Sequence, residues 1–266
     1  MKKIINKPTA VVDEMLDGLA YIHSDLVHRV EGFDIIARNS EKSGKVAIIS
    51  GGGSGHEPAH AGFVGDGMLS AAICGAVFTS PTPDQVLQAI KEADEGAGVF
   101  MVIKNYSGDI MNFEMAQDMA EMEGIEVASV VVDDDIAVEN SLYTQGRRGV
   151  AGTIFVHKIL GHAARAGKSL SEIKALADEL VTQIHTVGLA LSGATVPEVG
   201  KPGFILADDE IEFGIGIHGE PGYRKEKMQP SKELAQELVE KLKDSFELKA
   251  GDKIGILING MGATPL

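Results

Sequence analysis

Two histidines that each follow a run of glycines are the side chains of this chain best placed for chemistry. His56 lies in residues 51–58, Gly-Gly-Gly-Ser-Gly-His-Glu-Pro, and His218 lies in residues 213–222, Phe-Gly-Ile-Gly-Ile-His-Gly-Glu-Pro-Gly. Glycine lets the backbone adopt positive φ and approach a ligand closely, and a neutral imidazole is a competent nucleophile near pH 7. The repeated pattern predicts one site assembled from two distant parts of the chain.

The glycine run at residues 51–58 resembles a phosphate-binding loop, but it fits neither common template. A Walker A loop has Lys and Ser or Thr after its last glycine, whereas His56 and Glu57 stand here, and the dinucleotide fingerprint needs a glycine at the place of His56. The run follows an apolar stretch, and ligands of α/β sheets bind at the carboxyl ends of strands. Its amides could therefore hold a small oxygen-rich ligand, or the run could form only a tight turn.

Lys104 and Asp109 flank a second polar segment, Lys-Asn-Tyr-Ser-Gly-Asp, that directly follows an apolar stretch. By the same argument they belong at the same edge of a sheet. A lysine and a carboxylate there suit hydroxyl recognition and proton abstraction. Asp109 could equally serve as the N-cap of the following helix.

Three further features have simpler interpretations than a metal or anion site. The aspartates of residues 133–135 could bind Mg²⁺, but consecutive residues cannot all converge, so helix caps and a solvated turn are favoured. Arg147 and Arg148 suit either ion pairing or anion binding. His56 and His60 are four residues apart, but the surrounding prolines and glycines argue against the helix that a zinc site would require. We expect no metal on this chain.

Composition narrows the class of protein. The net charge of −15 argues against nucleic acid or an anionic membrane as partner. No apolar run approaches the roughly 20 residues of a membrane span, and residues 1–8 lack the apolar region of a signal peptide. The single cysteine, Cys74, excludes an internal disulfide and is expected to be a buried structural thiol. These features predict a cytoplasmic protein.

The apolar patterning predicts an α/β fold whose N-terminal, mostly parallel sheet is flanked by helices. The predicted strands are residues 46–50, 98–103 and 127–132, and the predicted helices are residues 11–28, 82–95, 112–123, 150–166 and 170–184. Thr82, Pro83 and Asp84 form a strong helix start, because a hydroxyl N-cap is followed by a proline and an acid in the first turn.

The pattern changes near residue 185, which predicts a second, smaller α/β (α+β) domain. Its predicted strands are residues 187–191, 203–206, 212–217 and 253–258, and its predicted helix is residues 230–246. We therefore expect residues 1–184 to carry the glycine loop and residues 185–266 to carry His218.

Seven segments, in this order, closely resemble the dihydroxyacetone kinase K subunit family. They are residues 51–60, 78–83, 104–109, 133–135, 146–149, 216–222 and 262–266. The resemblance implies a subunit that binds dihydroxyacetone covalently, as a hemiaminal between a ring nitrogen of His218 and the substrate carbonyl. Family members usually continue well beyond residues 262–266, so the second domain is expected to lack its C-terminal part.

The resemblance also implies roles for the other polar residues. Asp109 would take the proton from the hydroxyl that is phosphorylated, and His56 would hydrogen-bond a substrate oxygen. The implied substrate contacts are Gly53, Ser54, Gly55 and Lys104.

The family further implies which partners and cofactors the chain needs. No cofactor is expected on this chain, because ADP and Mg²⁺ belong to a separate L subunit that is recharged by a phosphotransferase-system protein. A homodimer is expected. The alternative is a K-like paralogue without kinase activity, which senses dihydroxyacetone and co-activates a transcription factor.

Overall fold

The computed structural model describes residues 3–39, 43–139, 141–142, 144–260 and 264. The N-terminal part contains η1 (Pro8–Ala10), α1 (Val11–Ile22), β1 (Val27–Arg29), β2 (Ile35–Arg38), β3 (Ala47–Ser54), η2 (Ala61–Phe63), β4 (Ala71–Val77), α2 (Pro83–Ala93), β5 (Val99–Lys104), α3 (Ser107–Met122), β6 (Val127–Val132), α4 (Thr153–Arg165) and α5 (Leu170–Val181). The C-terminal part contains β7 (Leu189–Ala190), β8 (Glu210–Phe213), β9 (Arg224–Lys227) and α6 (Ser231–Phe246).

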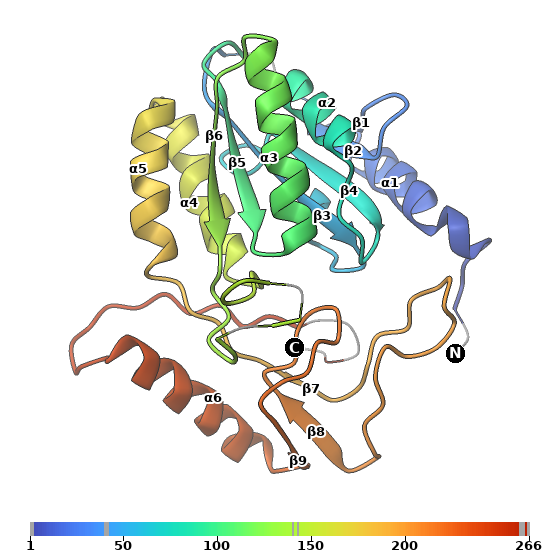
Figure 1. The fold of residues 1–266 in the computed structure, drawn as a ribbon, viewed down its shortest axis with the longest axis vertical. Coiled ribbons are helices and arrows are strands. Elements are labelled where there is room, and N and C mark those ends of the chain that lie inside the picture. Colours follow the sequence, from blue (N-terminus) through green and yellow to red (C-terminus); the bar gives the residue numbers. More distant parts are fainter. Residues whose placement is uncertain (1–2, 40–42, 140, 143, 261–263, 265–266) are drawn as a thin grey trace.

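A six-stranded sheet in the order β1-β2-β4-β3-β5-β6 organises the N-terminal part. The strands β4, β3, β5 and β6 run parallel, and β1 and β2 add an antiparallel edge. Helices α1, α4 and α5 contribute to the core on one face, and α2 and α3 contribute to the core on the other (Figure 1). This confirms the predicted mostly parallel sheet flanked by helices.

Strand β5 shows why the sheet needs helices on both faces. All six of its residues are buried. Phe100 and Val102 belong to one core, whereas Val99, Met101 and Ile103 belong to the other, because successive side chains of a strand point to opposite faces. A continuous apolar run is therefore stable only where both faces are covered.

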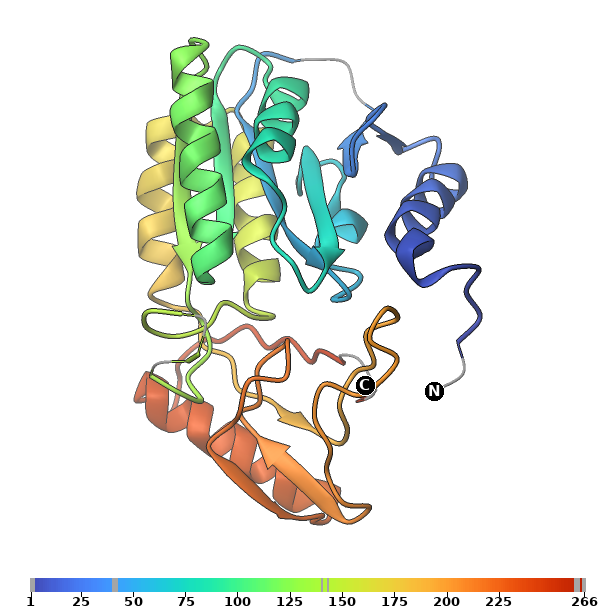
Figure 2. The same cartoon turned by 45° about the vertical axis from the view of Figure 1, so that its right-hand side comes forward.

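The C-terminal part is a three-stranded antiparallel sheet, β7-β8-β9, with α6 beside it. Its small core joins Ile211 and Phe213 of β8 to Leu234 of α6. Figures 1 and 2 show this part beyond the carboxyl ends of β5 and β6. It confirms a second, smaller α+β unit, while the exact division at residue 184 stays a prediction.

Three sequence predictions in the C-terminal part are wrong. The strand predicted over residues 212–217 ends at Phe213, because Gly214 adopts φ +70° and turns the chain. Residues 203–206 form no strand, although an isolated bridge joins Thr195 to Pro202 just before them. Residues 253–258 are not assigned to a strand, since no described strand pairs with them.

Three boundaries in the N-terminal part also differ from the prediction. Helix α3 begins at Ser107 instead of residue 112. Helix α1 ends at Ile22, and the residues that follow turn into β1. Strand β3 continues through the glycines to Ser54 instead of ending at Ser50. The short strands β1, β2 and β9 escaped prediction, β9 because all four of its residues are charged. Within the described residues, no helix is long and apolar enough to cross a bilayer.

Candidate functional site

The end of β3 lies against its neighbours at distances that only glycine allows. A Cβ on Gly51 would lie 2.6 Å from the carbonyl oxygen of Ile73, and one on Gly53 would lie 2.5 Å from the backbone nitrogen of Thr79. Strand β3 lies between β4 and β5 in the sheet, so this glycine run sits at the centre of its carboxyl edge. Close packing therefore explains these two glycines before any ligand is considered.

Gly52 leaves room for two charged side chains. A Cβ at this position would lie 3.2 Å from Lys104 Nζ and 3.5 Å from Asp109 Oδ2. Lys104 ends β5, and Asp109 lies in the first turn of α3. The structure thus brings Lys104 and Asp109 together with the glycine run, as the sequence predicted.

Asp109 is buried rather than placed at the cap of α3, where Tyr106 stands. Burial raises its pKa, although Lys104 and a hydrogen bond with Ser80 act in the opposite direction. Burial likewise lowers the pKa of Lys104, while Asp109, Asp134 and Glu220 act to raise it. Asp109 Oδ1 has no hydrogen-bond partner within the described structure, so it can accept a proton from a ligand.

His56 and His218 are in direct contact across the two parts of the molecule. Their Nε2 atoms are 3.0 Å apart, and the rings meet edge to face. His56 also stacks on Phe78, with ring centroids 4.8 Å apart. Burial, with further effects of Lys104 and His218, lowers the pKa of His56 to about 2, so this ring is neutral. The structure thus brings the two distant segments together, as the sequence predicted.

His218 keeps access to solvent, because its side chain is 20% exposed. Its Nδ1 lies 3.0 Å from Glu220 Oε1, and its backbone N–H donates to Glu220 Oε2. The rings of Tyr106 and Phe78 meet the His218 ring edge to face. Because Nδ1 of His218 contacts Glu220, Nε2 is the ring nitrogen that can face a ligand.

The remaining predicted substrate contacts lie at the same edge. Ser54 Oγ donates to the carbonyl oxygen of Gly75 at 2.7 Å, which leaves its lone pairs as possible acceptors. The backbone N–H of Gly55 donates to the Glu57 carboxylate at 3.1 Å. The contacts of Gly53, Ser54 and Gly55 with a substrate therefore remain predictions.

Of the aspartates in residues 133–135, the first is exposed and the other two are buried, so the solvated turn that the sequence suggested is present only in part. Asp134 is 1% exposed and accepts hydrogen bonds from the backbone of Val150 and Gly152 near the start of α4. Asp135 pairs with the fully buried Arg148 at 2.7 Å. Thr186 Oγ1 also donates to Asp134 and the backbone N–H of Ala137 donates to Asp135, so both buried carboxylates have hydrogen-bond donors within the chain.

Arg148 ties the two parts of the molecule together. Its Nη2 donates to the carbonyl oxygen of Gly214, in the turn that leads to His218. Of the two roles open to this arginine, the structure supports ion pairing.

The described residues contain no group of three or more His, Cys, Asp and Glu arranged to hold a metal ion. His60 faces His157 instead of His56, with Nδ1 and Nε2 2.9 Å apart. Cys74 is buried, and burial raises its pKa to about 12, which confirms the structural thiol.

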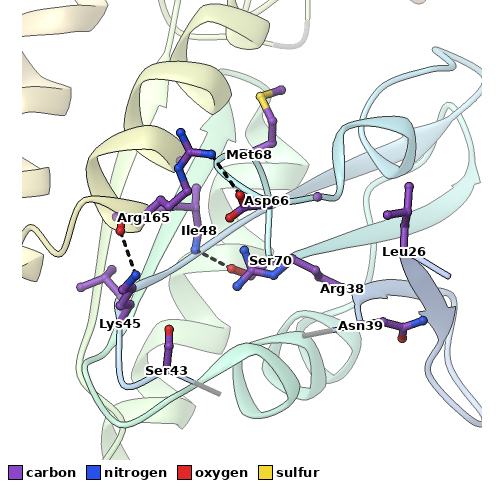
Figure 3. A pocket seen from close by; sticks show the side chains of 14 residues that line it. Leu26, Arg38, Asn39, Ser43, Lys45, Ile48, Asp66, Met68, Ser70 and Arg165 are labelled. Carbon is purple, nitrogen blue, oxygen red and sulfur yellow. Dashed lines mark hydrogen bonds and ion pairs between the residues drawn. The ribbon is translucent and has the colours of Figure 1, made fainter. Parts of the chain in front are cut away.

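A separate cavity lies near the start of β3, close to the C-terminal end of α4 (Figure 3). Three cationic side chains line this cavity, and each of them contacts another group of the chain. Arg165 pairs with Asp66, Lys45 donates to the carbonyl oxygen of Arg165, and Arg38 pairs with Glu95. These contacts within the chain explain the cationic lining of the cavity without a ligand.

Glu220, Tyr106 and Phe78 contact His218 in the candidate site, and the sequence predicted a role for none of them. The signal for Glu220 was its spacing, since a carboxylate two residues after a histidine in a glycine-rich turn can fold back onto the ring. For Tyr106 and Phe78 no sequence signal existed, because their ring contacts depend on how the two parts meet.

The fold and site define a class of α/β protein in which two histidines, a lysine and a carboxylate meet at the carboxyl edge of a parallel sheet. The sequence profile of the Dak1 domain matches residues 17–266, and the chain belongs to this family.

Three relatives illustrate the range of this family. The chain is 71% identical over 265 residues to the "PTS-dependent dihydroxyacetone kinase, dihydroxyacetone-binding subunit DhaK" of Lactococcus lactis, which covers all of this chain and 80% of the relative. The "DhaKLM operon coactivator DhaQ" of Lactococcus lactis is 45% identical over 266 residues, which covers 99% of this chain and 80% of the relative. The dihydroxyacetone kinase of C. freundii, solved with AMP-PNP and Mg²⁺, matches with a TM-score of 0.85 and 38% identity, over 91% of this chain and 45% of that chain.

Proposed function

We propose that this chain is the dihydroxyacetone-binding subunit of a phosphotransferase-system-dependent dihydroxyacetone kinase, and that it holds its substrate as a hemiaminal on His218. The observation that carries the proposal is the contact of His218 with His56 beside Lys104 and Asp109. The 71% identity to a subunit of that name supports the substrate.

The covalent step needs a nucleophile, a carbonyl carbon and a hydrogen-bond donor to the carbonyl oxygen. His218 Nε2 forms the N–C bond with its lone pair, and the carbonyl π pair moves to the oxygen, which takes up a proton from solvent. The neutral His56 can donate a hydrogen bond to that oxygen. A covalent bond to carbon selects carbonyl compounds over glycerol, which has no carbonyl to attack.

Asp109 is suited to the second step, the transfer of a phosphoryl group to a substrate hydroxyl. A buried carboxylate with a raised pKa and one free oxygen can take the hydroxyl proton as the oxygen attacks phosphorus. Lys104, beside it, carries a charge that would favour the incoming phosphate oxygens.

The phosphoryl donor is proposed to come from a separate subunit that carries ADP and Mg²⁺ and is recharged by a phosphotransferase-system protein. The glycine run fits neither nucleotide-binding template. Its amides are also occupied in part by the fold, as the contact of Gly55 with Glu57 illustrates. A homodimer and a cytoplasmic location complete the proposal.

A second candidate function is a dihydroxyacetone-sensing co-activator of a transcription factor. The 45% identity to the coactivator DhaQ favours it. The 71% identity to the kinase subunit of Lactococcus lactis, the organism of DhaQ, is higher and favours the enzyme.

The test is formation of dihydroxyacetone phosphate by this chain together with an ADP-loaded partner subunit and its phosphotransferase donor. Intact mass spectrometry of the chain with dihydroxyacetone is run in parallel. Product that requires the chain supports the kinase. An adduct without product would support the sensor, and the lack of both would overturn the proposed function.

A further inference from the structure

Two hydrogen bonds join the carboxylate of Glu220 to His218. Its Oε2 accepts the backbone N–H of His218 at 2.9 Å, and its Oε1 lies 3.0 Å from His218 Nδ1. Glu220 is only 2% exposed. Burial alone would raise its pKa, but the hydrogen bonds with His218 outweigh burial and lower it, so the carboxylate is ionised near neutral pH.

An ionised carboxylate decides which nitrogen of His218 carries the proton. It can only accept hydrogen bonds, so Nδ1 must carry a proton, and in the neutral ring Nε2 then keeps its lone pair. That lone pair faces His56 Nε2 at 3.0 Å. When both rings are neutral, His56 donates its own Nε2–H to this lone pair, and the chain of hydrogen bonds then has one consistent set of proton positions.

We propose that Glu220 is a positioning residue that keeps His218 in the Nδ1-protonated tautomer, so that Nε2 presents its lone pair to a carbonyl compound. The inference rests on the proposed function for its consequence, because the lone pair matters only if His218 Nε2 attacks the substrate. When the N–C bond forms, the imidazole ring becomes cationic and Nδ1 keeps its proton. A carboxylate 3.0 Å from that nitrogen stabilises the cation.

The loop around Glu220 is built to accommodate its carboxylate. A Cβ on Gly216 would lie 2.6 Å from Glu220 Cδ and 2.7 Å from Arg148 Nη1. The backbone N–H of Gly216 donates to the carbonyl oxygen of Glu220 at 2.9 Å, which closes the turn that contains His218. The glycine two residues before the histidine thus provides the space in which the carboxylate lies.

Glu220→Gln is the informative variant, because an amide has one acceptor oxygen where the carboxylate has two. Either the backbone N–H or the ring proton of His218 loses its acceptor. If the amide NH₂ faces Nδ1, His218 must move its proton to Nε2 and lose the nucleophilic lone pair. The matched control is Glu212→Gln. Glu212 is 4% exposed and accepts the backbone N–H of Gly222 at 2.8 Å in the same region, and none of its described hydrogen bonds involves His218.

The measurements are ¹⁵N NMR of the histidine rings in the free proteins and intact mass during titration with dihydroxyacetone. We expect a protonated Nδ1 on His218 in the wild type, partial protonation of Nε2 in Glu220→Gln, and an adduct that is weaker by roughly tenfold or more, as for loss of an orienting partner. Glu212→Gln should match the wild type in both measurements.

The outcomes separate the inference from the proposed function. A wild-type His218 protonated at Nε2 would overturn the inference, even if Glu220→Gln fails to fold. A Glu220→Gln variant with the wild-type spectrum and adduct would overturn it as well. A wild type with the expected spectrum but without any adduct would instead overturn the covalent function and leave the tautomer assignment standing.

Discussion

Two pairs of histidines are in contact in this molecule, and they differ in their surroundings rather than in their contact. His56 and His218 are 3.0 Å apart through their Nε2 atoms, and His60 Nδ1 lies 2.9 Å from His157 Nε2. Both pairs meet edge to face and join distant segments of the chain.

The surroundings give each pair a different capability. His218 has a carboxylate on Nδ1 and a side chain that is 20% exposed. His157 is fully buried, and in the described structure neither its Nδ1 nor His60 Nε2 has a hydrogen-bond partner. A histidine pair becomes reactive when one ring is oriented and accessible, and it remains a packing element when both rings are buried.

The largest expected effect is on the first pair. His218→Ala should abolish the covalent adduct with dihydroxyacetone, because the nucleophilic nitrogen is lost. Stability should fall by only about 1 kcal/mol, as for an ordinary point mutation of a partly exposed residue. Intact mass and urea unfolding measure the two effects. An adduct retained by this variant would move the nucleophile to another residue.

Asp109→Asn should separate substrate capture from phosphoryl transfer. The proposed adduct on His218 should persist, whereas turnover should fall by roughly 10²- to 10⁴-fold, as for loss of a general base. The readouts are adduct mass and the rate of dihydroxyacetone phosphate formation. Turnover at the wild-type rate would exclude Asp109 as the base.

His157→Ala should have the opposite profile to His218→Ala. Removal of a fully buried ring should lower the free energy of unfolding by about 3 kcal/mol, mainly through the cavity that it leaves. Folded protein at low temperature should still form the adduct. Urea unfolding combined with intact mass tests this, and a stable variant that fails to form the adduct would contradict the distinction between the pairs.

The smallest expected effect near neutral pH is the pH dependence of stability that the second pair contributes. Burial, with a further effect of Lys104, lowers the pKa of His157 from 6.5 to about 3, and burial also lowers that of His60. The unfolded chain therefore binds protons first, so stability is constant above pH 6.5 and falls as the pH drops from 6.5 towards 3. The loss should be about 1 kcal/mol per pH unit for each histidine.

His157→Phe is the comparison for this effect, since it keeps a ring in the core and removes one titrating group. The urea midpoint of the variant should fall less steeply than that of the wild type between neutral pH and pH 5. Equal slopes would show that His157 does not titrate on unfolding.

Much of the N-terminal part could be predicted from the sequence, because its signals are local. The apolar run of β5 and the Thr82 start of α2 needed no distant partner to be recognised, and α2 indeed begins with a capping box between Thr82 and Gln85. Short or polar strands such as β9 could not be predicted, since their ladder depends on a neighbouring strand. For the same reason, residues 253–258 look like a strand in sequence but have no described partner.

The sequence by itself determined the α/β class and the candidate residues for chemistry, because glycine runs, apolar runs and histidine motifs are properties of short segments. Only the tertiary structure decided which residues meet. It paired His56 with His218 and His60 with His157, and it placed Glu220 on His218 Nδ1. These contacts depend on how the two parts pack and which groups become buried, and burial sets both the protonation and the access that divide a reactive histidine from a structural one.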